Sequence, residues 1–181
     1  SKVFLKMGVT KSDFFKKVKR SDLIGQYLGS TALKTQEILN EVKEKGGVLF
    51  IDEAYSLGND QKRDHFSKEC IDTINQSLTE DKCDFICIIA GYKDELKKSF
   101  FSYNPGLESR FPFRFSIDNY GPKELRKIYL KLIEEDKDNW RIKSEKEVPL
   151  KFFEENKTYF KYNGRDMETL FHYTRIVHGR R

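Results

Sequence analysis

Over the first two thirds of the chain, short apolar runs alternate with segments in which apolar residues recur at helical spacing. Residues 48–52 and 84–90 are almost continuously apolar, which is typical of strands covered on both faces. Residues 14–19 predict a further short strand, and apolar positions at steps of three and four predict helices over 31–44 and 65–79. Strands that alternate with helices indicate a parallel sheet in an α/β architecture.

The pattern changes near Pro122. Before it, residues 110–117 alternate between apolar and polar side chains, and they predict a strand that starts after Pro112 because proline cannot donate to a sheet. After it the spacing is helical, and Pro122 itself suits the first position of a helix. We therefore predict two domains: an α/β subdomain over residues 1–120 and a small helical subdomain over residues 121–181.

The sequence pattern from Pro122 onward predicts three helices. The first begins at Pro122 and has an apolar stripe at helical spacing. The second is expected near residues 149–160. The third is expected to begin at Asn163, because an asparagine side chain can cap the first turn of a helix.

The net charge of +5 comes entirely from the start of the chain. Residues 1–45 contain ten Lys and Arg against five Asp and Glu, and the remaining residues balance. The basic residues are densest in KKVKR, residues 16–20. This stretch indicates either a patch for nucleic acid or another acidic partner, or an ordinary solvated strand edge.

Two further features restrict the class of protein. No apolar run approaches the roughly 20 residues that span a membrane, so we expect no membrane insertion. The three cysteines are odd in number and lack the spacing of a zinc site. Their arrangement favours a reduced intracellular compartment, the cytoplasm or an organelle, over a disulfide framework.

The most informative stretch is GGVLFIDEAYSL, residues 46–57, in which a buried strand runs into Asp52 and Glu53. Ligands of open α/β sheets bind at the carboxyl ends of strands, where these two acids would lie. An aspartate there can hold the Mg²⁺ of a nucleoside triphosphate, and a neighbouring glutamate can orient and deprotonate the attacking water. The alternative is a strand that simply ends in polar residues.

Five sequence blocks resemble the AAA+ ATPases, in the branch of the Rubisco activase CbbX and stage V sporulation protein K. They follow the family's order and cover most of the chain. The blocks are SDLIGQYLGSTALKT at 21–35, GVLFIDEAY at 47–55, IIAGYKDEL at 88–96, NPGLESRF at 104–111 and NGRDMETLF at 163–171. The resemblance implies an AAA+ type fold, with a parallel-sheet subdomain that is incomplete at its N-terminus, followed by a helical lid.

The resemblance also implies roles for these blocks in a ring that binds ATP and Mg²⁺. Asp52 would hold Mg²⁺ through the nucleotide, and Glu53 would activate water. A pore loop would grip a polypeptide in the centre of the ring, with an ordinary loop aromatic as the alternative for its tyrosine. The pore-loop residues are Gln26, Tyr27, Leu28 and Gly29.

Three arginines and one tyrosine complete the expected site. Arg110 follows a Pro-Gly turn and would act as an arginine finger on the nucleotide of a neighbouring subunit, with Arg114 as a second candidate. Arg165 lies in the first turn of a helix, where the helix dipole disfavours a cation, and would contact phosphates from the lid. Tyr92 falls where the family commonly has a polar residue that senses the γ-phosphate. Each arginine could instead be an ordinary surface cation.

The chain lacks a phosphate-binding loop (P-loop) of the form G-x-x-x-x-G-K-[ST], and no glycine in it precedes a lysine. By comparison with the family, this loop and its strand should lie just upstream of Ser1, with the strand in the middle of the sheet. We therefore expect a piece of a longer protein, inactive by itself. The alternatives are a chain that has lost nucleotide binding, or one completed by a separate N-terminal chain.

These observations lead to one main functional hypothesis. The parent protein would be a ring-forming ATPase, expected to be hexameric, that couples ATP hydrolysis to remodelling or threading a protein partner. One alternative is a non-hydrolysing scaffold or interaction subunit that keeps the ring interface. The other is a nucleic-acid-acting AAA+ protein that uses the basic N-terminal region, since the fold alone does not fix the function.

Overall fold

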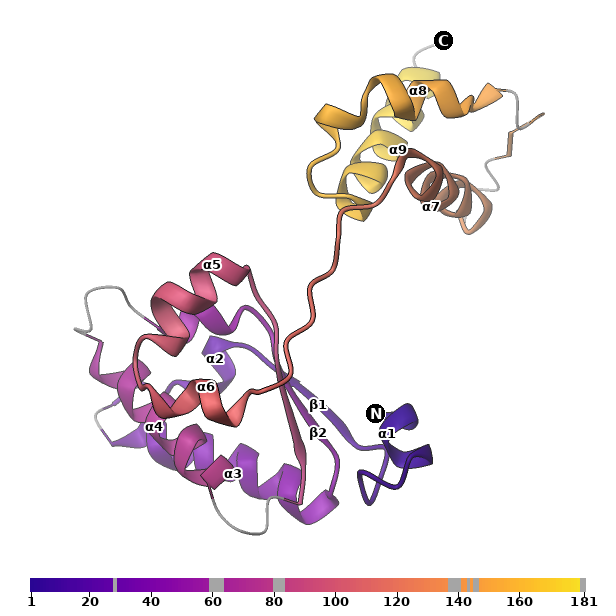
Figure 1. Ribbon diagram of the computed structural model, residues 1–181. Coiled ribbons are helices and arrows are strands. Elements are labelled where there is room, and N and C mark those ends of the chain that lie inside the picture. The colour runs from indigo at the N-terminus through magenta and orange to yellow at the C-terminus, as the bar shows by residue number, and fades with distance from the viewer. Residues whose placement is uncertain are drawn as a thin grey trace. The chain divides into compact units, whose positions relative to one another are not determined.

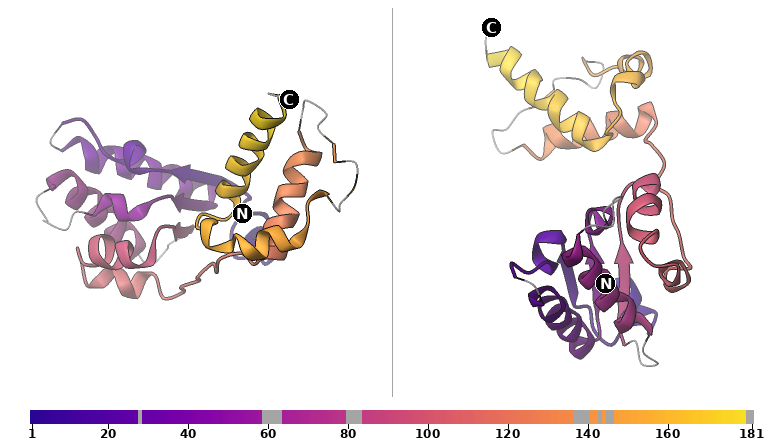
Figure 2. Two further views of the ribbon diagram at one scale, coloured as in Figure 1. Left: turned by 90° about the horizontal axis from the view of Figure 1, so that it is seen from above. Right: turned by 90° about the vertical axis from the view of Figure 1, so that its left-hand side faces the viewer.

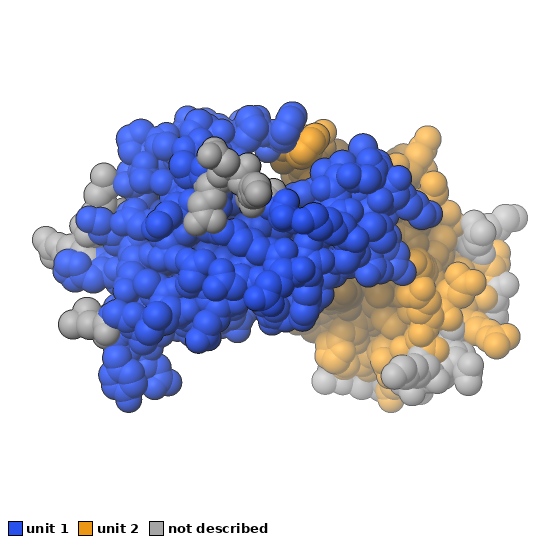
Figure 3. All heavy atoms as spheres, turned by 90° about the horizontal axis from the view of Figure 1, so that it is seen from below, with its two compact units in different colours: residues 1–114 blue, residues 115–181 orange. Residues whose placement is uncertain are grey.

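The computed structural model describes residues 1–27, 29–58, 64–79, 84–136, 141–142, 144 and 147–179. The chain divides into two compact units, residues 1–114 (unit 1) and residues 115–181 (unit 2), which Figure 3 shows in blue and orange. In the part of the chain that the structure describes, no helix combines the length and apolar character needed to cross a membrane.

Unit 1 is built on a parallel three-stranded sheet in the order β1-β2-β3. The strands are β1 (Phe15–Val18), β2 (Val48–Ile51) and β3 (Ile86–Ile89), with Val48 of β2 opposite Phe15 on one side and Ile86 on the other. The strands confirm the α/β class and the parallel sheet expected from the sequence. They also place β2 in the centre of the described sheet (Figure 1).

Two long helices connect these strands and confirm the predicted ones. They are α3 (Ser30–Lys45) and α4 (His65–Thr79), which lie side by side (Figures 1 and 2). Leu39 of α3 and Ile71 of α4 are fully buried with Leu49 of β2 in one apolar cluster. The helices thus cover the face of the sheet that Leu49 and Ile51 share.

Shorter helical segments complete unit 1. They are α1 (Lys2–Lys6), α2 (Arg20–Leu23), the 3₁₀ turn η1 (Ala54–Leu57), α5 (Lys93–Glu95), the π-helical turn η2 (Leu96–Phe101) and α6 (Gly106–Arg110). Phe100, Phe101 and Phe111 meet edge to face, with ring centroids 5.4 to 6.2 Å apart. This aromatic cluster joins η2 to the end of α6 and extends the core of unit 1.

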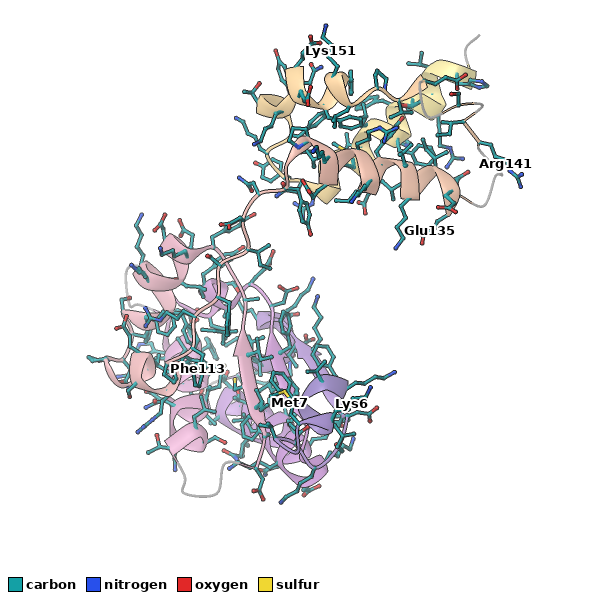
Figure 4. All side chains as sticks on the ribbon, turned by 45° about the vertical axis from the view of Figure 1, so that its right-hand side comes forward. Lys6, Met7, Phe113, Glu135, Arg141 and Lys151 are labelled. Carbon is teal, nitrogen blue, oxygen red and sulfur yellow. The ribbon has the colours of Figure 1, made fainter. Side chains whose placement is uncertain are left out.

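Two expectations about strands are corrected. Residues 111–121 form no strand, and Phe113 (labelled in Figure 4), Phe115 and Ile117 are 83%, 91% and 91% exposed. Alternation of apolar and polar residues does not by itself make a strand, because the backbone groups of a strand need a neighbouring strand to bind. None of the described strands pairs with this segment. The run at 84–90 does form β3, but among the described strands β3 has a neighbour on one side only, and its residues are half-buried instead of covered on both faces.

Unit 2 contains α7 (Pro122–Glu134), α8 (Leu150–Glu155), the 3₁₀ turn η4 (Lys157–Tyr159) and α9 (Gly164–Gly179). Pro122 occupies the start of α7, as predicted. The helix expected over 149–160 is shorter, because its regular turns end at Glu155. The core of unit 2 consists of Leu125, Tyr129, Ile133, Phe153, Met167 and Phe171.

Asn163 directly precedes α9, as predicted, but its side chain does not cap the helix. Its amide oxygen accepts the backbone N–H of Tyr120 at 2.9 Å, and its amide nitrogen donates to the side chain of Asn119 at 3.1 Å. Its backbone is left-handed, with φ of 52°. Asp166 in the first turn reaches back and accepts the N–H of Tyr162 at 2.6 Å. Asn163 therefore fixes the segment before α7 against the start of α9.

Because each unit has its own core, we expect a core mutation to destabilise one unit alone. Phe153→Ala should cost unit 2 about 3–5 kcal/mol of unfolding free energy, since it empties a fully buried aromatic site. Hydrogen exchange should show lost protection in α7 and α9 but not in β2. Phe152→Ala, at a partly exposed neighbouring ring, is the matched control and should cost about 1 kcal/mol. Equal loss of protection in β2 would contradict the division.

Candidate active site

Asp52 and Glu53 form a turn, here called the acid turn, at the carboxyl edge of the sheet. The N–H of Asp52 donates to the carbonyl of Val18 at the end of β1, at 2.9 Å. The N–H of Ala54 donates to the carbonyl of Ala90, just after β3, also at 2.9 Å. Both neighbouring strands thus hold the backbone on either side of the two acids.

The Asp52 carboxylate is paired with a cation on the neighbouring strand. Lys17 Nζ of β1 lies 2.8 Å from Asp52 Oδ2, and both side chains are partly exposed. The hydrogen bond from Lys17 lowers the pKa of Asp52 below its ordinary value, although partial burial acts in the opposite direction. Asp52 is therefore ionised at neutral pH, as a metal-binding carboxylate must be.

Glu53 has a strained backbone and a free carboxylate. Its φ and ψ are 52° and 43°, the left-handed region that costs a residue with a side chain roughly 1–2 kcal/mol. Such strain persists only where the surroundings impose it, and it is concentrated at functional sites. The Glu53 side chain is exposed and makes no hydrogen bond or ion pair with any described residue. It is available to a water molecule or a ligand at this edge.

A pair of tyrosines lies beside the acid turn. The rings of Tyr55 in η1 and Tyr92, just before α5, are 5.9 Å apart. A Cβ on Gly91 would lie 2.8 Å from the Tyr55 ring, so the close approach of this loop requires glycine. Partial burial, and then the charge of Glu53, raise the pKa of Tyr55. The contact with Tyr55 thus places Tyr92 near the edge that holds Asp52 and Glu53.

A partly buried arginine that the sequence pattern did not single out also reaches this turn. Arg20 Nη1 donates to the carbonyl of Ser56 in η1 at 2.7 Å, and Arg20 Nη2 lies 2.5 Å from Asp64 Oδ2. The sequence shows Arg20 only as the last residue of the basic stretch 16–20. Its partners are 36 and 44 residues away, so no local pattern could have identified them.

The donors at the acid turn fit a Mg²⁺ ion carried by a nucleotide. The described residues contain no group of three or more His, Cys, Asp or Glu side chains that could form a protein cage for a metal. Mg²⁺ bound with a nucleotide does not need one, because it uses one or two carboxylates with phosphate oxygens and water. A single ionised Asp52 at the carboxyl edge of the sheet meets that requirement.

The predicted pore loop connects α2 to α3 and is exposed. Tyr27 is 74% exposed, and Gln26 is exposed beside it. The loop base is fixed, since the Ser30 hydroxyl donates to the Tyr27 carbonyl at 2.6 Å and Gly29 adopts a left-handed φ of 81°. Leu28 lies outside the described residues. No described ring packs on Tyr27, so the aromatic points to solvent instead of covering its own unit.

The predicted arginine fingers lie away from the acid turn of their own chain. Arg110 Nε donates to the hydroxyl of Thr79, the last residue of α4, at 3.1 Å. The start of α4 contacts Arg20 near the acid turn, and α4 is 15 residues long, so its ends are roughly 20 Å apart at 1.5 Å per residue. Arg114 stacks over the Phe101 ring at 5.0 Å. Neither arginine therefore joins Asp52 and Glu53 within one chain.

Arg165 belongs to unit 2. It is exposed in the first turn of α9, and its guanidinium makes no hydrogen bond or ion pair with any residue that the structure describes.

The basic stretch at 16–20 is different, because its cations are mostly paired. Lys16 lies 2.9 Å from Glu41, in addition to the pairs that Lys17 and Arg20 make with carboxylates. These pairs leave little free positive charge in the stretch.

Comparisons with known proteins agree with this geometry. The model of the ATPase family associated with various cellular activities (AAA) matches residues 3–119. A CfxQ-like protein of Acanthamoeba polyphaga mimivirus is 46% identical over all of this chain and 44% of its own length. Stage V sporulation protein K of Bacillus subtilis is 39% identical over 83% of this chain and 45% of its own length.

A third relative, the chromosomal CbxX protein of Cupriavidus necator, is 39% identical over 71% of this chain and 39% of its own length. The chain thus spans less than half the length of each of these relatives. The family match covers the sheet, the acid turn and the segment up to Asn119. The parallel α/β fold, the site at its carboxyl edge and these matches together show that the chain belongs to the AAA family of ATPases, in the branch of CfxQ, CbbX-like proteins and stage V sporulation protein K.

Proposed function

We propose that this chain is part of a ring-forming ATPase, expected to be a hexamer, which couples ATP hydrolysis to remodelling or threading a protein partner. One observation carries the hydrolysis part of the proposal. The Glu53 carboxylate is exposed and unpaired among the described residues, yet its backbone is held in a strained conformation next to the ionised Asp52. A subunit that never hydrolyses ATP has no evident use for that arrangement.

In the proposed reaction Asp52 would hold the nucleotide's Mg²⁺, which would neutralise charge on the phosphates. Glu53 would orient the attacking water and accept its proton, and Tyr92 is proposed to sense the γ-phosphate. The given sequence contains no P-loop of the form G-x-x-x-x-G-K-[ST] to cradle the phosphates.

The position of the arginines supports a ring. Because α4 separates Arg110 from the acid turn of its own chain, Arg110 is suited to the nucleotide of a neighbouring subunit. Arg114 is the weaker candidate, since it already stacks on Phe101 and lies 3.5 Å from Glu108. Arg165 of unit 2 has no side-chain partner among the described residues. We propose that it contacts phosphates from a helical lid formed by residues 121–181.

A protein substrate is favoured over nucleic acid by the surface charge. The exposed Tyr27 offers an aromatic contact for an extended polypeptide. Nucleic acid would need a run of free cations, whereas the basic stretch is largely paired with carboxylates of unit 1. The buried Cys70 forms no disulfide, which is compatible with the reduced cytoplasm or organelle that we propose as its compartment.

Replacing Glu53 with glutamine should abolish ATP turnover in the full-length protein. Glutamine cannot accept the proton of the attacking water, so the rate constant should fall at least about 10²-fold while ATP binding is retained. Phosphate release and nucleotide binding are the two measurements. Glu95→Gln makes the same chemical change at an exposed position of α5 and should leave turnover unchanged. Undiminished hydrolysis by the Glu53 variant would remove it from this role.

Complementation between inactive subunits tests whether Arg110 acts on a neighbour. Full-length Arg110→Ala and Glu53→Gln proteins should each be inactive alone. Mixing them should restore part of the activity, because an intact Glu53 can then receive an intact Arg110 from the adjacent subunit. No recovery in rings shown to contain both variants would contradict action in trans. The same mixture made with Arg114→Ala tells which arginine is the finger.

Removing the Tyr27 ring should uncouple ATP hydrolysis from a polypeptide partner. Tyr27→Ala should keep basal turnover and lose the stimulation produced by an unfolded model polypeptide, since the proposed contact with substrate is gone. Tyr159→Ala removes an equally exposed tyrosine of unit 2 and is the matched control. Stimulation by single-stranded DNA that depends on Lys16 and Lys19 would favour the nucleic-acid alternative instead.

A further inference from the structure

The turn η1, which directly follows Glu53, is held from two sides. Arg20 Nη1 donates to the carbonyl of Ser56 at 2.7 Å, and the Ser99 hydroxyl of η2 lies 2.9 Å from the carbonyl of Tyr55. The Ser56 N–H in turn donates to the Glu53 carbonyl at 2.8 Å. Because these bonds share one short turn, a shift of η1 moves the backbone that sets the direction of the Glu53 side chain.

Arg20 is itself rigidly anchored. Its guanidinium binds Asp64 and the Ser67 hydroxyl, each at 2.5 Å, at the start of α4. Asp64 also accepts the Ser67 hydroxyl at 2.8 Å and the Phe66 N–H at 3.1 Å. A planar guanidinium can serve three acceptors at fixed angles, whereas an ammonium group cannot reproduce that fork. The Arg20 side chain is therefore a rigid link between α4 and η1.

The same residue begins the segment that leads to the exposed tyrosine. Arg20 is the first residue of α2, and α2 runs into the loop of Tyr27 after one turn. The other end of α2 is buried at Leu23, whose carbonyl accepts the hydroxyl of Thr35 on α3 at 3.1 Å. The short helix α2 thus lies between the Tyr27 loop and the contact of Arg20 with η1.

We propose that Arg20 is a positioning residue that couples the Tyr27 loop to the acid turn, so that a polypeptide at Tyr27 changes the placement of Glu53 through the Arg20–Ser56 contact. This inference rests on the proposed function. If Arg20 served only to stabilise the fold, its ion pair with Asp64 would be enough. Arg20 also donates a hydrogen bond to the Ser56 carbonyl, and stabilising the fold does not require this second contact.

The mildest test is Arg20→Lys in the full-length protein. Lysine can still pair with Asp64 but cannot hold the Ser56 carbonyl and the Ser67 hydroxyl at the same time. We expect only a small decrease in melting temperature, from the lost hydrogen bonds, and an unchanged KM for ATP. We expect a loss of polypeptide-stimulated kcat of about tenfold, because small misplacements of a catalytic group are costly. A merely structural role would leave the ratio of stimulated to basal turnover unchanged, whatever the melting temperature, and this result would overturn the proposal.

Lys11→Met is the matched control. Lys11 forms an ion pair with Asp84 at 2.6 Å, and its backbone binds Gly46, so it lies at the opposite, amino edge of the sheet. Its removal should leave stimulation intact. If Arg20→Lys fails to fold, the double variant Arg20→Met with Asp64→Asn removes both charges of the pair, keeps an amide oxygen to accept the N–H of Phe66 and makes the same measurement possible. A normal stimulation ratio in that variant would also overturn the proposal.

A double-mutant cycle with Tyr27→Ala completes the test. If the two residues act in one path, the combined variant should lose no more stimulation than the stronger single variant. Independent, multiplying effects would refute the coupling. The wild-type protein separates the two proposals. If polypeptide does not stimulate its ATP hydrolysis, the proposed function is rejected. If the wild type is stimulated and the Arg20→Lys variant is stimulated equally, this inference alone is rejected.

Discussion

The parallel pairing of β2 with strands on both sides is the constraint on which the arrangement of unit 1 depends. A strand with neighbours on both edges has its backbone groups satisfied along its length, so its residues can be apolar and buried. Parallel neighbours also end at the same edge. The residues just after β1, β2 and β3 therefore meet there, and hydrogen bonds from Asp52 to Val18 and from Ala54 to Ala90 close the group.

This meeting point explains how a strained residue is tolerated at the site. The left-handed Glu53 lies between two residues, Asp52 and Ala54, whose N–H groups are bound to the ends of the neighbouring strands. The free energy of the sheet thus offsets the local backbone cost. The result is a carboxylate that points out of the fold without a protein partner among the described residues, next to one whose charge Lys17 balances.

The helix α4 contacts a different arginine at each of its two ends. Its first turn, with Asp64 and Ser67, contacts Arg20 at the edge of the acid turn. Its last residue, Thr79, contacts Arg110. A connection between parallel strands must return the chain to the amino edge, so a crossover helix separates groups at its two ends by its own length. The geometry of a single chain consequently keeps the acids and the arginine apart, and this suits an assembly in which neighbours exchange them.

The sequence by itself determined the class of the fold and the location of the acids, because those depend on local patterns. Continuous apolar runs identified β2 and β3, steps of three and four identified α3, α4 and α7, and Asp52 and Glu53 come after a strand in the chain as they do in space. It could not show that residues 111–121 lack a strand, since strand formation requires a neighbour. It also could not show that Asn163 binds Tyr120 instead of capping its helix.

The tertiary structure alone decided which residues support the acids. Arg20 looked like one more cation of a basic stretch, and only the fold brings it to Ser56 and Asp64, 36 and 44 residues away. Likewise, Lys17 meets Asp52 only because β1 and β2 pair in one register. Local sequence patterns determine the helices and strands and the residues at their ends. Contacts between distant segments, such as those of Arg20 and Lys17, arise from the packing of those elements.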